Sequence, residues 1–194
     1  MKKLKNKRDL THRSTAEGFI DVLVGLQWGD EGKGKNIDEL LSKGIYSGVA
    51  RFQGGANAGH TIKFGDKTFI GHIVPSGCLQ KNVELYIGNG VVVDAVSLIA
   101  EISQLKSLGF NVTPRLYISN RAKLVSYLHP FLDQAEESYR SKDGKKIGTT
   151  SRGIGPAYSD SRARRGLLIG DLNSPDFKQK EKELSNLHMN FLNM

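Results

Sequence analysis

Apolar and polar positions alternate along the chain in blocks that predict strands and helices in turn. Four short apolar runs have the length and composition of buried strands. They span residues 22–26, 49–52, 85–87 and 116–118. The third run is expected to end at Gly88-Asn89-Gly90. Two further runs, 61–64 and 68–73, flank Gly65-Asp66-Lys67 and predict a hairpin.

Helical spacing of apolar residues predicts helices between these strands. One follows the first strand, with Ile37, Leu40 and Leu41 on one face. Another extends over 122–140, with Pro130 expected to kink or divide it. This alternation predicts an α/β fold with a predominantly parallel central sheet.

Two helices have clear start signals in the sequence. Asp94 is expected to cap one of them, and Gly109 to end it. Its predicted apolar stripe is Val96, Ile99, Ile102 and Leu105. Ser174 and Pro175 are expected to start the last helix. The apolar face predicted for that helix is Phe177, Leu184, Leu187 and Phe191. Because no cap or closing strand follows it, the fold is expected to be incomplete at its C-terminus.

The composition is that of a water-soluble α/β protein with many turns, since 38% of the 194 residues are hydrophobic and 22 are glycine. Half of the formal net charge of +8 lies in the first twenty residues, where six Lys or Arg oppose Asp9 and Glu17. No aromatic residues are interleaved with these charges. Residues 1–20 therefore predict a disordered, solvated basic extension and no nucleic-acid partner.

No apolar run approaches the roughly 18 residues of a membrane span, and the first twenty residues lack the apolar core of a secretory signal. Membrane partners are therefore not expected. Cys78 is the single cysteine and cannot form an internal disulfide, which favours a reducing compartment. These features predict a cytoplasmic protein.

A glycine-rich turn follows the first predicted strand and bears two lysines. Gly29 and Gly34 enclose four residues ahead of Lys35, which satisfies the G-x-x-x-x-G-K part of a P-loop. The backbone N–H groups of such a loop face anionic oxygens at a helix N-terminus. The segment therefore predicts a phosphate-binding loop.

Two residues depart from the usual P-loop pattern. Asn36 stands where a P-loop carries the Ser or Thr that binds magnesium. Asp30 places a carboxylate inside the turn, where it would repel a phosphate unless another group compensates. The loop is therefore a modified one.

Two further segments combine small residues with polar side chains. The first is RFQGGANAGHT at 51–61, where small residues permit close approach of a ligand. Its His60 is a candidate functional residue, whereas the other histidines are expected to be ordinary surface or core side chains. The second segment is IGTTSRGIGPAY at 147–158, followed by arginines, which predicts a second anion-binding site. Two phosphate-bearing ligands are therefore expected.

Together these segments resemble the adenylosuccinate synthetase family. QWGDEGKGK, NAGHT, PSG, IGNGVV, IGTTSRGIGPAY and ARRG occur in the family's order over residues 21–171. The resemblance implies a modified P-loop NTPase-like fold, a homodimer, and a ligase of AMP and purine biosynthesis. Its substrates would be IMP, GTP and L-aspartate, with Mg²⁺ as cofactor. Residues 21–194 would be its nucleotide- and IMP-binding part.

The resemblance also implies roles for individual residues. Asp30 would be the base that takes the N1 proton of IMP, and His60 the acid that supports charge on the transferred phosphoryl group. The intermediate would be 6-phosphoryl-IMP. Contacts to GTP would come from Gly29, Asp30, Glu31, Gly32, Lys33, Gly34, Lys35, Gly59, His60 and Thr61. Contacts to IMP would come from Asp30, Glu31, Gly32, Lys33, Asn57, Ala58, Gly59 and His60. Its phosphate would be contacted by Thr150 and by Arg164 of a neighbouring subunit. Mg²⁺ would be met by Asp30 and by the backbone carbonyl of Gly59.

Two alternatives stay open at this stage. Family members are considerably longer, and their guanine- and aspartate-binding segments have no counterpart here, so the chain is also consistent with a non-catalytic nucleotide-binding remnant. A P-loop kinase, or an amide-forming ligase for another purine, is the other alternative.

Overall fold

The computed structural model describes residues 18–27, 31–64 and 67–193. The chain divides into two compact units, Met1–Lys33 and Gly34–Met194. Most of the predicted basic extension, residues 1–17, lies outside the described residues. Among the described residues, the regular secondary structure belongs to the second unit, apart from Lys33 at the start of the first helix.

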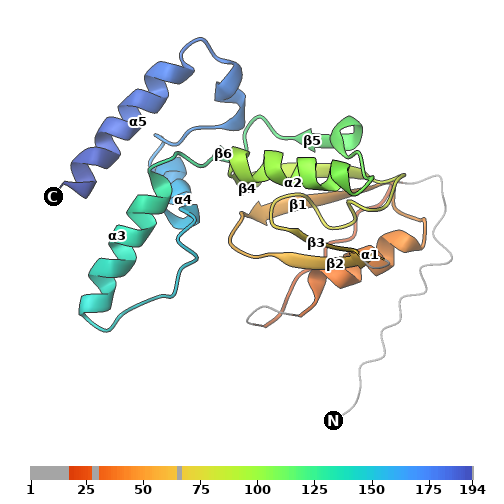
Figure 1. Cartoon of the computed structure of the whole chain (residues 1–194). Helices are drawn as coiled ribbons and strands as arrows, with labels where there is room; N and C mark the ends of the chain where they lie inside the picture. The colour runs from red at the N-terminus through yellow and green to blue at the C-terminus, as the bar shows by residue number, and fades with distance from the viewer. Residues whose placement is uncertain (1–17, 28–30, 65–66, 194) are drawn as a thin grey trace. The chain divides into compact units, whose positions relative to one another are not determined.

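A parallel sheet forms the centre of the second unit (Figure 1). Strand β4 (Glu84–Val93) lies between β1 (Gly48–Gly54) and β5 (Leu116–Ile118), and it pairs with both in parallel. The short strand β6 (Lys123–Leu124) pairs in parallel with the end of β4. The α/β fold with a predominantly parallel sheet, predicted from the sequence, is therefore confirmed.

The expected hairpin also forms. Strands β2 (His60–Phe64) and β3 (Lys67–Gly71) pair antiparallel, and His60 lies opposite Gly71 in the register. The candidate residue His60 is thus the first residue of a strand, which fixes its backbone.

Strand β4 does not end at Gly88-Asn89-Gly90 as predicted but continues to Val93. The glycines serve close packing here. A Cβ atom at Gly90 would lie 2.2 Å from the backbone oxygen of Phe52. At the same point the register between β1 and β4 shifts between Arg51 and Gln53. Glycine in a strand that touches a neighbouring backbone resembles a turn signal in the sequence, which explains the error.

The predicted strand at residues 22–26 is wrong as well. Residues 18–26 have no regular secondary structure, and the side chains of Val22 and Leu26 are 69% and 91% exposed. A buried strand needs neighbouring strands that accept and donate its backbone hydrogen bonds. Among the described residues none pairs with this segment, so apolar composition alone does not produce a strand.

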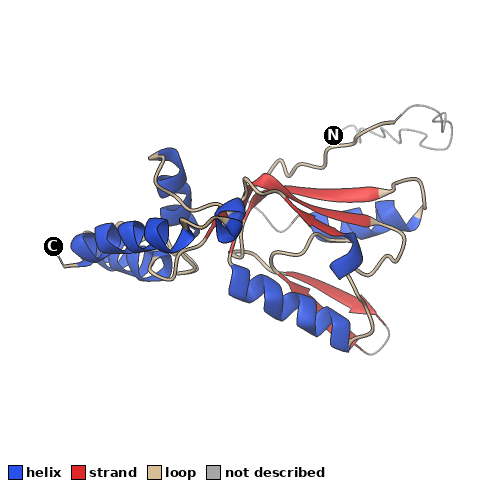
Figure 2. Ribbon diagram, turned by 90° about the horizontal axis from the view of Figure 1, so that it is seen from above, coloured by secondary structure: helices blue, strands red, loops and turns tan. Residues whose placement is uncertain are grey.

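Five α-helices and two short 3₁₀ helices lie among the described residues (Figure 2). The α-helices are α1 (Lys33–Ser42), α2 (Ala95–Ser107), α3 (His129–Lys142), α4 (Ile154–Arg162) and α5 (Phe177–Leu192). The 3₁₀ helices are η2 (Thr113–Arg115) and η3 (Ile169–Asn173). In this part of the chain, none of the helices has both the length and the apolarity to cross a membrane.

Helix α2 begins as predicted but buries a different face. The Asp94 carboxylate accepts the N–H groups of Val96 and Ser97, so the cap is confirmed. Val96 and Ile99, however, are 79% and 65% exposed. Residues advance by about 100° along a helix, so Leu98 and Leu105 share a face that excludes both of them. The predicted stripe was therefore wrong in half of its members.

The buried face of α2 carries a carboxylate that the apolar pattern did not reveal. Glu101 accepts the backbone N–H groups of His72, Ile73 and Val74 at 2.9 to 3.1 Å. Its side chain thus satisfies three consecutive donors just after the hairpin. This arrangement fixes the chain between β3 and the Pro75–Gly77 turn.

Helix α3 starts seven residues later than predicted, because residues 123–124 pair with β4 as β6. Pro130 lies in the first turn of α3, where its missing N–H costs no hydrogen bond, so it starts the helix and does not kink it. The last helix, α5, begins at Phe177 after Asp176, two residues beyond the expected start. Of its predicted apolar face Leu184 is buried, whereas Phe191 is exposed.

Candidate functional site

The first turn of α1 lies against the start of β2. A Cβ atom at Gly34 would lie 3.3 Å from both His60 Cβ and Ser76 Oγ, closer than side chains normally pack. Gly34 therefore lets the helix N-terminus approach His60. Lys35 follows it in the same turn with an exposed side chain. The end of the predicted phosphate-binding loop, Gly34, and the candidate residue His60 are therefore neighbours.

The predicted loop ahead of α1 is described only in part. Gly29 and Asp30 lie outside the described residues. The Glu31 carboxylate accepts the N–H of Gln27 at 3.1 Å and forms an ion pair with Lys33 at 2.8 Å. Gly32 adopts a positive φ of 74°, a conformation that favours glycine. The loop thus holds one of its lysines in a local ion pair.

Arg51 stabilises the glycine-rich loop that leads to β2 by hydrogen bonds to backbone carbonyl oxygens. Its guanidinium donates to the carbonyl oxygen of Gly55 at 2.6 Å and to that of His72. Asn57 is exposed and its side-chain oxygen accepts the N–H of Gly55 at 3.3 Å. Arg51 stands at the head of the RFQGGANAGHT motif, but its role in holding the loop was not predicted. A basic residue inside a predicted strand is the only signal that could have indicated this role.

The remaining candidate positions of this motif face outward. Ala58, Gly59 and Thr61 are exposed. A ligand can therefore reach the backbone of Gly59 and the hydroxyl of Thr61.

His60 is the most unusual titratable group of the site. Its Nε2 atom is buried and has no hydrogen-bond partner among the described residues. Burial, together with the nearby Arg51 and His72, lowers the pKa of His60 to about 4. The ring is therefore neutral at neutral pH. A buried imidazole nitrogen without a partner is available to a ligand.

Tyr158 of α4 joins the second and third predicted segments. Its hydroxyl accepts the N–H of Gly54 at 3.0 Å and donates to the carbonyl oxygen of Gly90 at 2.7 Å. The glycine-rich loop after β1 is thereby attached to the helix that follows IGTTSRG. The segment predicted to admit a ligand closely and the segment predicted to bind an anion are thus linked by one hydroxyl.

Thr150 and Arg164 lie at opposite ends of α4. Thr150 is exposed in the loop before the helix. Arg164 is exposed after the last turn and has a φ of 61°, which is unusual for a residue with a side chain. The chain by itself does not bring these two residues together.

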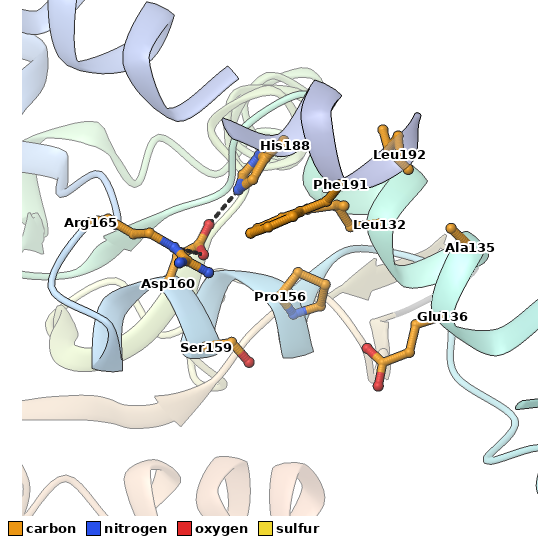
Figure 3. A pocket seen from close by; sticks show the side chains of 10 residues that line it. All are labelled: Leu132, Ala135, Glu136, Pro156, Ser159, Asp160, Arg165, His188, Phe191 and Leu192. Carbon is orange, nitrogen blue, oxygen red and sulfur yellow. Dashed lines mark hydrogen bonds and ion pairs between the residues drawn. The ribbon is translucent and has the colours of Figure 1, made fainter. Parts of the chain in front are cut away.

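One cluster among the described residues has the composition of a metal site. His129, Asp160 and His188 are buried, and the two Nε2 atoms lie 2.9 and 2.6 Å from the same oxygen of Asp160. Figure 3 shows the bond between His188 and Asp160. Asp160 and His188 border a cavity of about 350 Å³ that is also lined by Leu132 and Phe191.

The hydrogen bonds of this cluster indicate a structural role and not metal binding. The N–H of Ser126 donates to Nδ1 of His129 at 2.9 Å, so Nε2 of the neutral ring carries the proton and donates to Asp160. A metal ligand would need that nitrogen unprotonated. Arg165 donates to the other oxygen of Asp160 at 2.7 Å.

Asp160 is therefore a fully bonded carboxylate that connects α3, α4 and α5. Burial by itself would raise its pKa. The hydrogen bonds from His129, Arg165 and His188 outweigh that effect and hold the pKa below its usual range. His129 and His188 are both buried in the core, and Nδ1 of His188 has no hydrogen-bond partner among the described residues.

The family model described as adenylosuccinate synthetase matches residues 22–194. The chain belongs to the adenylosuccinate synthetase family. It is 52% identical over 163 residues to an adenylosuccinate synthetase of Chlorobaculum tepidum, covering 84% of this chain and 37% of that relative. The chain thus spans less than two fifths of the length of this adenylosuccinate synthetase.

Two solved structures agree with this membership. A fully ligated adenylosuccinate synthetase from Plasmodium falciparum superposes with a TM-score of 0.79 at 43% identity, over 86% of this chain and 38% of that one. The succinoaminodeoxyadenylate synthetase of cyanophage S-2L, bound to dGMP and dATP, gives a TM-score of 0.56 at 26% identity, over 74% and 39% of the two chains.

Proposed function

We propose that this chain supplies the IMP-binding and phosphoryl-transfer part of an adenylosuccinate synthetase. The complete activity is the GTP-dependent ligation of IMP and L-aspartate to adenylosuccinate, a step of purine and AMP biosynthesis. The observation that carries the proposal is the neutral ring of His60, whose Nε2 has no partner among the described residues and whose Cβ lies beside Gly34 in the first turn of α1. A neutral imidazole still has one N–H group, which can donate a hydrogen bond to a phosphoryl oxygen while the ring stays neutral.

In this reaction Asp30 takes the N1 proton of IMP, and the electron pair moves to O6. O6 then attacks the γ-phosphorus of GTP, the bond to GDP breaks, and 6-phosphoryl-IMP forms. His60 stabilises the phosphoryl oxygens during the transfer, because a fixed donor aimed at developing charge lowers the barrier. The amino group of aspartate then attacks C6 and inorganic phosphate leaves.

The same family resemblance leads us to propose which residues contact GTP and which contact IMP. Gly29–Lys35 and Gly59–Thr61 contact the phosphates of GTP. Asp30–Lys33, Asn57–His60 and Thr150 contact IMP, and Arg164 reaches the IMP of a neighbouring subunit in a homodimer. The exposed backbone at Gly59 and the exposed Thr150 side chain support these contacts. We place the enzyme in the cytoplasm.

The proposed magnesium ligands fit the chemistry of that ion. The carboxylate of Asp30 and the carbonyl of Gly59 are hard oxygen donors, which Mg²⁺ prefers. When bound, Mg²⁺ neutralises charge on the phosphates of GTP. This donor set needs no hydroxyl at Asn36.

A calorimetric titration of the purified chain with IMP tests the binding part of the proposal. We expect saturable binding with one IMP per chain, and about tenfold weaker binding for Thr150→Val, since a lost hydrogen bond to a charged group has that order of effect. The matched control is Thr113→Val, an exposed threonine of η2 that is expected to bind like the wild type. A chain that binds neither IMP nor GTP would contradict the proposal. A chain that binds both nucleotides but gives no turnover when completed would favour the non-catalytic remnant.

A further inference from the structure

Helix α3 carries a polar stripe that the apolar pattern did not predict. His129, Asp133 and Glu137 are spaced by four residues and therefore lie on one face of the helix. His129 and Asp133 are buried, and Glu137 is half-buried. A buried polar stripe requires partners for each of its groups.

Each member of this stripe bonds to the segment between residues 147 and 160. His129 bonds to Asp160 near the end of α4. The Asp133 carboxylate accepts the N–H of Gly153 at 2.9 Å, just before α4. These two contacts place the end of α4 beside the start of α3 and the start of α4 one turn further along α3, so the two helices run antiparallel.

Glu137 holds the loop ahead of α4. Its carboxylate accepts the N–H of Ile147 at 3.3 Å and also that of Gly148. The N–H of Gly148, and less strongly those of Ile147 and Thr149, hold the pKa of Glu137 below its usual value. The carboxylate is therefore charged at neutral pH.

The two carboxylates anchor both ends of a short bridge, residues 149–152. Inside it the Thr149 hydroxyl accepts the N–H of Ser151 at 3.4 Å. Ser151 has a φ of 53°, which costs free energy for a residue with a side chain. Such a conformation persists only where the surrounding contacts determine it, and here those contacts are the two anchors.

We propose that Asp133 and Glu137 are positioning residues, which hold Thr149–Arg152 in the conformation that receives the phosphate group of a nucleotide. The inference rests on the proposed function for its ligand, since Thr150 is the residue assigned to the phosphate of IMP. A loop ordered in advance loses less conformational entropy on binding. Neither anchor touches the ligand.

If Glu137 instead competes with the phosphate for the backbone N–H groups of the loop, the opposite effect on binding is expected. A carboxylate that fills a group of backbone N–H donors occupies the position of an anion. If Glu137 competed with the phosphate, its removal would strengthen binding. If Glu137 positions the loop, its removal weakens binding.

The variant Glu137→Gln in the full chain separates these outcomes. The control is Glu136→Gln, a neighbour with the same change of charge whose carboxylate pairs with Arg140 and not with the loop. We measure amide hydrogen exchange, the affinity for IMP and for inorganic phosphate, and the midpoint of thermal unfolding. Asp133→Asn tests the second anchor by the same measurements.

For Glu137→Gln we expect exchange at Ile147 and Gly148 to rise about tenfold and the Kd for IMP to rise by a similar factor. The unfolding midpoint should stay at that of the control. Unchanged or tighter binding of IMP, or unchanged exchange at both amides, would overturn the proposal. Failure of the wild type to bind IMP would refute the proposed function, whereas the exchange data would still decide whether the carboxylate anchors the loop.

Discussion

Replacing Asp30 by Asn is expected to reduce turnover by about 10²–10⁴-fold, because the amide cannot take the N1 proton of IMP. The measurement needs a protein of full length. We suggest a chimera in which residues 22–194 replace the matching part of the Plasmodium falciparum adenylosuccinate synthetase. Adenylosuccinate formation is followed with IMP, GTP, Mg²⁺ and aspartate in excess.

The control for this variant is Glu39→Gln, which removes one negative charge from the exposed side of α1. It should turn over like the unchanged chimera. If Asp30→Asn retained more than about a tenth of the rate, proton abstraction by Asp30 would be the wrong assignment.

His60→Ala is expected to lower kcat of the same chimera by about 10²–10³-fold, the usual cost of losing one donor to a transition state. His60→Asn keeps an N–H donor and should recover part of this loss. Since the wild-type ring stays neutral down to a pH of about 4, the rate should show no step from His60 ionisation between pH 5 and pH 8. A rate for His60→Ala near that of the wild type would remove His60 from the chemistry.

Much of the fold follows from local patterns. The runs around Val49, Leu85 and Leu116 became three parallel strands because short apolar segments followed by turns need a covered sheet. The Asp94 cap formed as predicted, because its hydrogen bonds involve only the next three residues.

The wrong secondary-structure predictions occur where contacts with residues distant in the sequence determine the local structure. Gly88 and Gly90 resemble a turn in the sequence, but they are needed where β4 touches the backbone of β1. Residues 22–26 have a strand composition, but no strand among the described residues pairs with them. Both cases depend on partners that lie far away along the chain.

In the candidate site, too, some residues were predicted from local motifs and others were not. The motifs identified His60 and the loop around Thr150, because glycine-rich segments with hydroxyls and basic residues are characteristic of phosphate binding. They did not identify the groups that hold those segments in place. Arg51, Glu101 and Glu137 are charged, and a charged residue in a sequence is normally assigned to solvent.

The proposed mechanism requires that GTP phosphorylates O6 of IMP before aspartate attacks C6. Turnover of IMP carrying a heavy oxygen isotope at O6 tests it in the chimera, with the released phosphate examined by mass spectrometry. The mechanism predicts that the label appears in the inorganic phosphate, because the bond between C6 and O6 breaks when aspartate displaces phosphate. Adenylosuccinate formed together with unlabelled phosphate would contradict the mechanism.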